Sequence, residues 1–564
     1  MDRKIGSTNV GFIPKMSNIN RRFARLIASV IAATALCAGV LIAGASGSAS
    51  ASATSSAAKR HDTIGSSLVV DTNKGKVKGF LTGTNNSLVS FEGIPYAAPP
   101  VGSLRLAAPQ PHAAWSNTLD AYQPGSECLQ STRGPGGTIA GSEDCLYLNV
   151  TVPNNNKPNK PVLVMLYGGG FQGGQGAEYN DQLLANADNV ILVTPNYRLG
   201  ILGWLASSAL DNGKGASGDY GIEDDQAALR WVQKNIAGFG GNPHNVTLGG
   251  LSAGAMMTCL NLAAPGSRGL FQRAIVESGP CAFNWETLQT KETAESSIPA
   301  MLCALEGAPA PTANAAETSC LRAATTDEIM TVQNEVKLGA DDTSPPSVGG
   351  SVVPNEPRTA LGKIPLLTGG VVAELAFGAP TTEPAASYLS DLTKFYGAPY
   401  AQAIADNYPL NGTYLAGVSA LQRAESDFGG TNGGGELGAC YEVRSDQIDK
   451  AAGGTLYAWQ FGDIAAGNIA HTSQEQYLFP LWNNNVPANG APLSGASVGL
   501  SQMMVKYWGN FIATGNPNGN GLPHWPKYST PTSIMELQPG AVGPGANVSQ
   551  QHKCGFWWSA GLSE

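Results

Sequence analysis

The sequence predicts an α/β fold in which helices flank a large, mostly parallel central sheet. Short apolar runs that suit buried strands, at 162–166, 190–193, 246–248 and 274–276, alternate with helical stretches, of which 222–236 is the clearest. Strands that are apolar throughout are typical of parallel sheets, because both faces of such sheets are covered. A glycine-flanked serine directly after the strand 246–248 is a further indication, since a turn of this kind stands at the carboxyl end of such a sheet.

The first 53 residues predict an export signal. Arg21, Arg22 and Arg25 precede an apolar run over 26–45, and small residues with Ala-x-Ala sites follow. The run is about 20 residues long, so an uncleaved membrane anchor is the alternative. With residues 1–53 removed, we expect a secreted protein with no stable membrane insertion, in which 64–564 form a single domain.

The composition is that of a large globular protein, with 42% hydrophobic and 13% charged residues. The net charge is −9, and removing residues 1–53, which hold six Lys/Arg and one Asp, takes it to about −14. A nucleic-acid partner is not expected for so acidic a chain. Apart from Cys37, eight cysteines remain, an even number that permits disulfides in an oxidising compartment.

In chain order, short strand-like pieces over 68–97 predict an antiparallel start to the sheet. The central strands and helices follow. The Ala-rich stretches 297–340 and 383–428 predict helical insertions within one domain, because no long linker separates them from the rest. The glycine-rich run 429–438 predicts a loop, and 455–461 predicts a further strand.

The pattern Gly250-Leu251-Ser252-Ala253-Gly254 joins the strand 246–248 to a predicted helix over 253–262. Glycine on both sides permits a turn too tight for a Cβ, which presents the serine hydroxyl to a substrate. The same pattern recurs around Ser497, but that copy follows a loop and not a strand. Ser252 is therefore the predicted nucleophile.

A serine hydroxyl is a weak nucleophile near neutral pH and needs an adjacent base. In folds of this kind the base follows the serine in the chain, which leaves His471, His524 and His552. Only His471 follows a convincing strand, 455–461, by a short loop, and it is the predicted base. The other two are expected to be surface or packing residues.

The base needs a carboxylate that holds its tautomer. Glu374 ends the mostly apolar run 364–373, so a strand there would deliver it to the same sheet edge as Ser252. It is the predicted acid, with Glu442 and Asp463 as alternatives.

Backbone N–H groups free of bulky side chains are needed where negative charge develops on a substrate oxygen. The segment Tyr167–Phe171, with three glycines, directly follows the strand 162–166 and meets this requirement. Gly169, Gly170 and Ala253 are the predicted donors of an oxyanion hole. A phosphate-binding loop is excluded, because the Lys-Ser/Thr pair that it requires is missing.

Several longer motifs accompany these residues: Phe91–Ala97, Pro99–Gly102, Glu143–Val150, Asn196–Gly200, Asp225–Leu229, Phe239–Pro243, Glu277–Gly279, Gly515–Asn518 and Trp525-Pro526. Together they resemble the type-B carboxylesterase/lipase family of cholinesterase-like serine esterases. The resemblance implies an α/β-hydrolase fold with helical insertions and a triad of Ser252, Glu374 and His471. It implies neither a metal nor an organic cofactor.

The resemblance also implies disulfides. It pairs Cys128 with Cys145, Cys303 with Cys320, and Cys440 with Cys554. Cys259 and Cys281 remain, either as buried thiols or as a fourth pair.

The chain departs from the family pattern at several positions. Leu251 and Gln474 stand where relatives usually carry glutamates that lie close together, and Glu475 is a candidate to compensate. Leu375 replaces a usual glycine after the acid. The loop 128–145 lacks the tryptophan with which cholinesterases stack a quaternary ammonium, and it is too small and polar for the apolar lid of a lipase.

These observations predict a secreted serine esterase that hydrolyses small, uncharged carboxylic esters through an acyl-enzyme intermediate. A lipase acting on long-chain lipid esters is one alternative. A catalytically inactive adhesion or binding protein of the same fold is the other.

Overall fold

The computed structural model describes the chain from residue 68 to residue 560, with internal gaps. The gaps are 132–137, 156, 180–182, 212–214, 284, 306–313, 336–344, 376–383, 416–417, 430–436, 480–491 and 546. All described residues belong to one compact unit. The predicted export signal over 1–53, the first residues of the predicted domain 64–564 and most of the predicted loop 429–438 lie outside the described residues.

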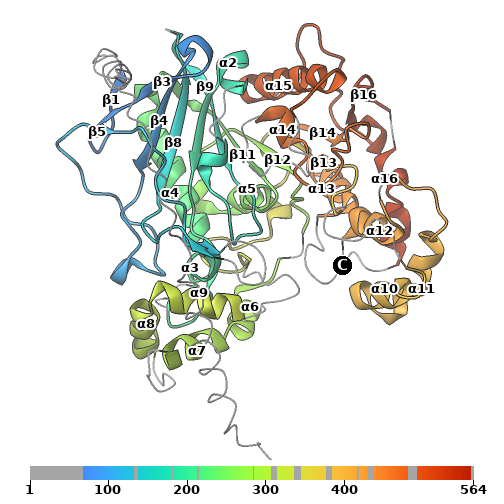
Figure 1. The fold of residues 1–564 in the computed structure, drawn as a ribbon, viewed down its shortest axis with the longest axis horizontal. Helices are drawn as coiled ribbons and strands as arrows, with labels where there is room; N and C mark the ends of the chain where they lie inside the picture. The colour runs from blue at the N-terminus through green and yellow to red at the C-terminus, as the bar shows by residue number, and fades with distance from the viewer. Residues whose placement is uncertain are drawn as a thin grey trace, which may run out of the picture. The chain divides into compact units, whose positions relative to one another are not determined.

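A sheet of eleven strands, counted over the described residues, forms the centre of the protein (Figure 1). Its order is β16-β15-β14-β13-β12-β11-β9-β10-β8-β4-β3. The strands are β3 (Phe80–Thr82), β4 (Leu88–Pro95), β8 (Tyr147–Pro153), β9 (Lys160–Leu166), β10 (Ile191–Pro195), β11 (Gly241–Leu251), β12 (Arg273–Glu277), β13 (Leu366–Val371), β14 (Leu456–Phe461), β15 (Met535–Leu537) and β16 (Gly543–Pro544).

The sheet is parallel from β10 to β15 and antiparallel at both ends, where β8, β4 and β3 follow β10 and β16 follows β15. The parallel strands are apolar because helices cover both their faces; Val162, Val164, Val246 and Leu248 have no exposed surface. This arrangement confirms the predicted fold class. Of the predicted antiparallel start, β3 and β4 belong to the central sheet, whereas the strands at 69–71 and 76–78 pair antiparallel in a separate small sheet.

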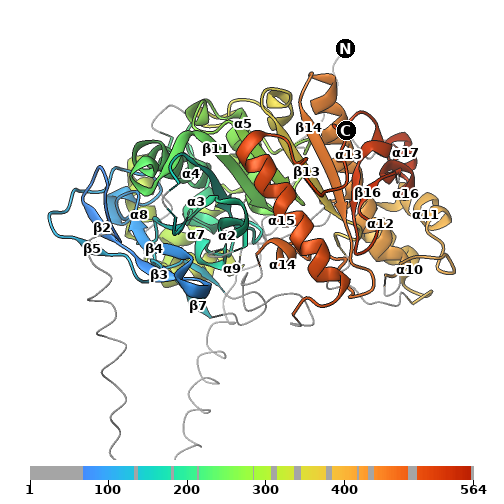
Figure 2. The same ribbon diagram turned by 90° about the horizontal axis from the view of Figure 1, so that it is seen from above.

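Helices pack on both faces of the sheet (Figure 2). The helices α4 (Tyr220–Asn235), α5 (Ala253–Ala263) and α13 (Ala439–Ala451) cover one face. The helices α2 (Leu183–Asp188) and α15 (Ala496–Thr514) pack against each other over the other face. The sequence predictions included α4 and α5 but not α15, which is buried over much of its surface and exposes a polar stripe that includes Gln502 and Lys506.

The two predicted insertions are helical where they are described, and each packs in an apolar cluster separate from the main core. The first contains α6 (Leu288–Ala294), α7 (Ser297–Leu305), α8 (Asn314–Ala323) and α9 (Thr326–Glu335). The second contains α10 (Tyr388–Tyr396), α11 (Ala398–Asn407) and α12 (Ala420–Phe428), and the C-terminal α17 (Cys554–Ser559) packs with it through Trp557. None of the described helices is long and apolar enough to cross a membrane.

Smaller elements complete the described chain. A three-stranded sheet consists of β1 (Val69–Asp71), β2 (Lys76–Lys78) and β5 (Leu119–Asp120), and a two-stranded one of β6 (Gln130–Ser131) and β7 (Ile139–Ala140). The short helices are α3 (Gly200–Trp204), α14 (Glu475–Leu478) and α16 (Val548–Gln551).

Four disulfides lie within the described residues. Three are the expected pairs, Cys128–Cys145, Cys303–Cys320 and Cys440–Cys554. The fourth joins Cys259 of α5 to Cys281 after β12, so these two cysteines are a pair and not buried thiols.

Candidate active site

Ser252 stands between β11 and α5 in a strained backbone conformation. Its φ is 55° and its ψ is −122°, a region that L-residues with a side chain rarely adopt. The flanking glycines make the turn possible, because a Cβ at Gly250 would lie 2.2 Å from the carbonyl oxygen of Gly254. A Cβ at Gly254 would lie equally close to the carbonyl oxygen of Leu166. The sharp strand-to-helix turn predicted from the sequence is therefore present.

The glycine segment after β9 packs directly against this turn. A Cβ at Gly168 would lie 3.1 Å from the Cβ of Ser252 and 2.9 Å from the carbonyl oxygen of Leu251. Only glycine permits so close an approach. The structure thus brings the start of the predicted oxyanion loop, 168–170, into contact with the predicted nucleophile.

The N–H groups of Gly169 and Gly170 form no backbone hydrogen bond to another described residue. Ala253 is the first residue of α5, where an N–H has no partner within the helix. Tyr167 anchors the base of the loop: its hydroxyl donates to the Tyr197 carbonyl at 2.7 Å, and the Tyr197 hydroxyl donates back at 2.6 Å. Three amide groups around Ser252 are therefore available to a ligand.

Glu374, which is buried, and His471, which is partly buried, form a pair. Glu374 Oε2 lies 2.6 Å from His471 Nδ1, and Glu374 Oε1 accepts a hydrogen bond from the Val371 N–H at 2.8 Å. The His471 N–H also donates to the Glu374 carbonyl oxygen at 3.1 Å. With the Nδ1 proton directed at the carboxylate, Nε2 of His471 is left as the basic nitrogen.

Neighbouring parallel strands deliver these residues to one edge of the sheet. Leu251 is in register with Glu277 of β12, and Glu277 with Gly369 of β13. β14 lies beside β13 and leads into the segment that carries His471. The carboxyl ends of β11, β13 and β14, which belong to one parallel run, therefore place Ser252, Glu374 and His471 at a common edge of the sheet.

Ser252 Oγ forms no hydrogen bond within the described residues, and Ser252 is only 9% exposed. In the structure Glu374 is hydrogen-bonded to His471, and Gly168 packs against Ser252. Ser252 and His471 form no hydrogen bond with each other. Such nucleophile–base contacts are often long in ligand-free enzymes and shorten when a substrate binds.

The alternatives to the predicted site residues have other partners. Ser497 lies in α15, and the described residues directly before that helix, 492–495, form no strand; the Ser497 hydroxyl donates to Asp463. Asp463 also accepts from the Tyr477 hydroxyl at 2.7 Å. His552 is fully buried against Asp427, as expected of a packing residue, and His524 is exposed.

Glu442, the other alternative acid, lies behind Glu374. A cavity of about 20 Å³ is lined by both carboxylates together with Asp446 and Trp459. Burial raises the pKa of Glu442 to about 8, and the charge of Glu374 adds to the rise. Glu442 is therefore protonated at neutral pH, and Glu374, not Glu442, is the carboxyl that contacts His471.

The departures from the family pattern are buried beside the site. Leu251, Gln474 and Glu475 expose almost no surface. Glu475 contacts Glu277 at the end of β12. The sequence identified Glu475 only as a candidate, and its partner Glu277 only as part of the motif Glu277–Gly279, without a role.

Comparisons with known proteins agree with this geometry. The model of the Carboxylesterase family matches residues 66–409 and 456–557. Carboxylesterase 1D of Mus musculus is 30% identical over 87% of this chain and 92% of its own. Para-nitrobenzyl esterase of Bacillus subtilis (strain 168) is 36% identical over 60% of this chain and 70% of its own.

Solved structures agree as well. A structure of PNB esterase has a TM-score of 0.70 and 28% sequence identity, and the match covers 86% of this chain and 99% of that one. The α/β-hydrolase fold that the resemblance implied is therefore confirmed. The family match spans most of the chain, and the chain belongs to the carboxylesterase family as a carboxylic-ester hydrolase.

Proposed function

We propose that the protein is a secreted serine esterase that uses Ser252 as nucleophile, His471 as general base and Glu374 as the residue that orients His471. The observation that carries the proposal is the strained turn at Ser252, which stands at the same sheet edge as the hydrogen-bonded Glu374–His471 pair. Strain of about 1–3 kcal/mol at one residue persists where the surrounding structure enforces it, and it is common at active sites.

The reaction has two steps. Ser252 Oγ attacks the ester carbonyl carbon while its proton moves to His471 Nε2. The tetrahedral intermediate collapses, the C–O bond to the alcohol breaks, and His471 gives its proton to the leaving oxygen. A water molecule then attacks the acyl-enzyme with His471 again as base, which releases the carboxylic acid and restores Ser252.

Each intermediate carries negative charge on the former carbonyl oxygen. The N–H groups of Gly169, Gly170 and Ala253 are the donors that would stabilise it. Support comes from the contact of the preceding Gly168 with Ser252 and from the position of Ala253 at the start of α5. These amides belong to the backbone, so the fold sets their positions in advance of the reaction.

The expected substrates are uncharged esters. Glu374 and the Glu277–Glu475 pair are acidic groups buried on the base side of the site, and their negative charge disfavours an anionic acyl group. The loop between Cys128 and Cys145 has no tryptophan, so it lacks the best partner for a quaternary ammonium.

Secretion is part of the same proposal. We infer that residues 1–53 are an export signal and that 64–564 form the catalytic domain. The four disulfides of the described residues support an oxidising destination, because structural disulfides are rare in reducing compartments.

A panel of p-nitrophenyl esters of increasing acyl length tests the proposal. We expect a burst of p-nitrophenol equal to the enzyme concentration, the mark of an acyl-enzyme, and faster turnover of short than of long chains. Ser252→Ala should abolish turnover. Activity confined to emulsified long-chain esters would favour a lipase, and parental turnover by Ser252→Ala would refute the assignment.

A further inference from the structure

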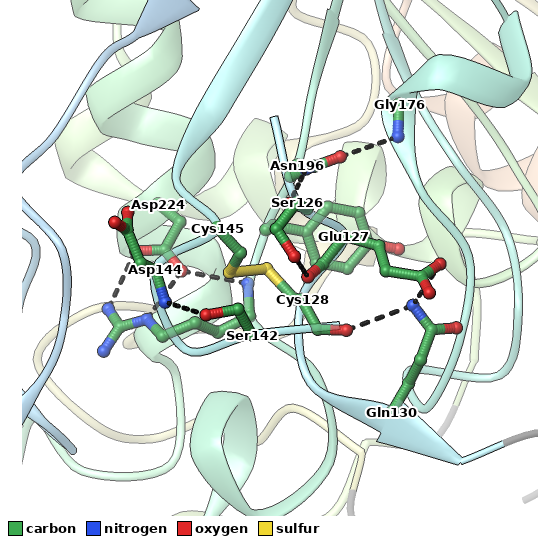
Figure 3. Close-up of a disulfide and its surroundings, with 12 residues drawn as sticks. Ser126, Glu127, Cys128, Gln130, Ser142, Asp144, Cys145, Gly176, Asn196 and Asp224 are labelled. Carbon is green, nitrogen blue, oxygen red and sulfur yellow. Dashed lines mark hydrogen bonds and ion pairs between the residues drawn. A yellow bond between two sulfur atoms is a disulfide. The ribbon is translucent and has the colours of Figure 1, made fainter. Parts of the chain in front are cut away.

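The side chain of Gln130 joins the loop closed by Cys128–Cys145 to the glycine segment after β9. Its Oε1 accepts from the Gly174 N–H at 2.9 Å, and its Nε2 donates to the Gly174 carbonyl oxygen at 3.1 Å. The same Nε2 donates to the Cys128 carbonyl oxygen at 3.1 Å and lies 3.3 Å from Glu127 Oε2 (Figure 3). One amide group therefore holds both backbone groups of Gly174 against the disulfide loop.

Gly174 is part of one tight turn with the oxyanion loop. A Cβ at Gly174 would lie 2.5 Å from the Gly168 carbonyl oxygen, and the Gly173 N–H donates to the Gly169 carbonyl oxygen at 3.2 Å. Fixing Gly174 therefore limits the movement of Gly168 and Gly169.

The far end of this segment is fixed to the residues just before the same disulfide loop. Asn196 accepts a hydrogen bond from the Gly176 N–H at 2.8 Å and donates to the Ser126 carbonyl oxygen at 2.9 Å (Figure 3). Two side-chain amides, from Gln130 and Asn196, thus connect 174–176 to 126–130.

We propose that Gln130 is a positioning residue for the oxyanion hole and that the Cys128–Cys145 disulfide holds Gln130 in place for this role. The proposal rests on the proposed function, because it assigns the amides of Gly169 and Gly170 to the reaction. Glycines have great conformational freedom and no side chains with which to hold their own backbone. Donors for an oxyanion must nevertheless be fixed to within about 0.5 Å, which requires support from neighbouring groups.

The first test compares Gln130→Ala with Gln233→Ala on a short p-nitrophenyl ester. Gln233 is a matched control, because its Nε2 also donates to two backbone carbonyl oxygens, those of Pro243 and Leu270, away from the glycine segment. We expect Gln130→Ala to lower kcat about tenfold or more with KM within about twofold, since misplaced donors weaken the transition state and not substrate binding. Equal kcat in both variants would overturn the role of Gln130.

A second variant, Gln130→Glu, gives a readout that loss of folding cannot imitate. A protonated carboxyl can accept from the Gly174 N–H and donate to the Gly174 carbonyl oxygen, as the amide does, whereas a carboxylate can only accept. Glu127 is the titratable side chain in contact with this position among the described residues. We expect the ratio of variant to parental kcat to fall as pH rises through the titration of the new carboxyl. A ratio that does not change with pH would contradict the proposal.

The disulfide provides a third comparison. Cys128–Cys145 and Cys303–Cys320 both have a sequence separation of 17, so their loss should release similar entropy in the unfolded chain. Replacing the first pair by alanines should lower kcat as Gln130→Ala does, and replacing the second should not. Equal kcat for the two double variants would overturn the part assigned to the disulfide. Parental turnover by Ser252→Ala would refute the proposed function itself, whereas parental kcat in Gln130→Ala refutes only the positioning role.

Discussion

Glu277 and Glu475 bury two carboxyl groups against each other beside the active site, although they are almost 200 positions apart in the chain. Glu277 Oε1 accepts from the Trp508 indole N–H at 2.8 Å, and Glu475 Oε1 accepts from Gln474 at 3.4 Å. The second oxygen of each has no N–H or O–H donor among the described residues. Burial raises the pKa of both carboxyls, and we expect two carboxyls in this position to share one proton.

The shared proton makes stability depend on pH. Burial, and then the charge of Glu277, hold the pKa of Glu475 well above its ordinary value. A carboxyl whose pKa is raised by folding contributes stability that is full below about pH 4 and is lost as pH rises through the folded-state pKa. We expect the free energy of unfolding to fall less steeply between about pH 5 and about pH 9 in Glu475→Gln than in the parent.

Urea denaturation at several pH values measures this effect. The glutamine amide can donate to Glu277 without titrating, so the variant should keep the contact. Glu335→Gln, at an exposed position at the end of α9, is the control and should follow the parent. An identical pH dependence in the parent and in Glu475→Gln would mean that the two carboxyls do not share a proton.

For His552 we expect stability to depend on pH in the opposite direction, with a loss of stability at acid pH. Its Nδ1 lies 2.6 Å from Asp427 and its Nε2 lies 2.6 Å from the Gln460 side-chain nitrogen, a pattern that suits the neutral ring. Burial, and next the charge of Arg423, lower the pKa of His552. The unfolded chain therefore binds a proton that the folded chain resists, and stability should fall as pH drops below about 6.5.

Replacing His552 by glutamine should remove part of this acid sensitivity and cost about 1–3 kcal/mol at neutral pH, since Asp427 loses a buried partner. Thermal melting between about pH 5 and about pH 7 provides the measurement. His524→Gln, at an exposed position, should change neither quantity. Unaltered acid sensitivity in His552→Gln would assign the effect to another group.

The two copies of the G-x-S-x-G pattern allow a matched glycine test. A Cβ at Gly254 would lie 2.2 Å from the Leu166 carbonyl oxygen, whereas a Cβ at Gly499 would meet no atom within 4 Å. Gly254→Ala should therefore displace the turn and abolish activity. Gly499→Ala, inside α15, should leave activity intact and add up to about 1 kcal/mol of stability. Comparable activity in the two variants would contradict the tight turn at Ser252.

The Cys259–Cys281 pair predicts a thiol count. In denaturant, the chain without residues 1–53 should show no free thiol that reacts with a thiol reagent, because all eight remaining cysteines are paired. Removing this disulfide by a double alanine substitution should cost about 2–4 kcal/mol, mainly through the unfolded chain. Two reactive thiols that map to Cys259 and Cys281 would show that the pair does not form.

The parallel core could be predicted because its strands are apolar throughout. The positions of Glu374 and His471 could be predicted because parallel strands place the residues that follow them at a common edge of the sheet. The short β15 and β16 at one end of the sheet were not predicted, since two or three residues carry no periodicity. Contacts such as Gln130 with Gly174 and Glu277 with Glu475 also had no local signal. They depend on which segments the fold brings together, and a glutamine in a loop looks the same in the sequence whether or not it holds a neighbour.

Labelling with a fluorophosphonate, followed by peptide mapping, tests the central claim most directly. The account predicts one label per molecule, attached to Ser252, and a loss of ester hydrolysis in proportion to labelling. His471→Ala should take up the label more slowly than the parent, because Ser252 then lacks its base. Full hydrolytic activity in quantitatively labelled protein, or a label on another serine such as Ser497 with Ser252 unmodified, would contradict it.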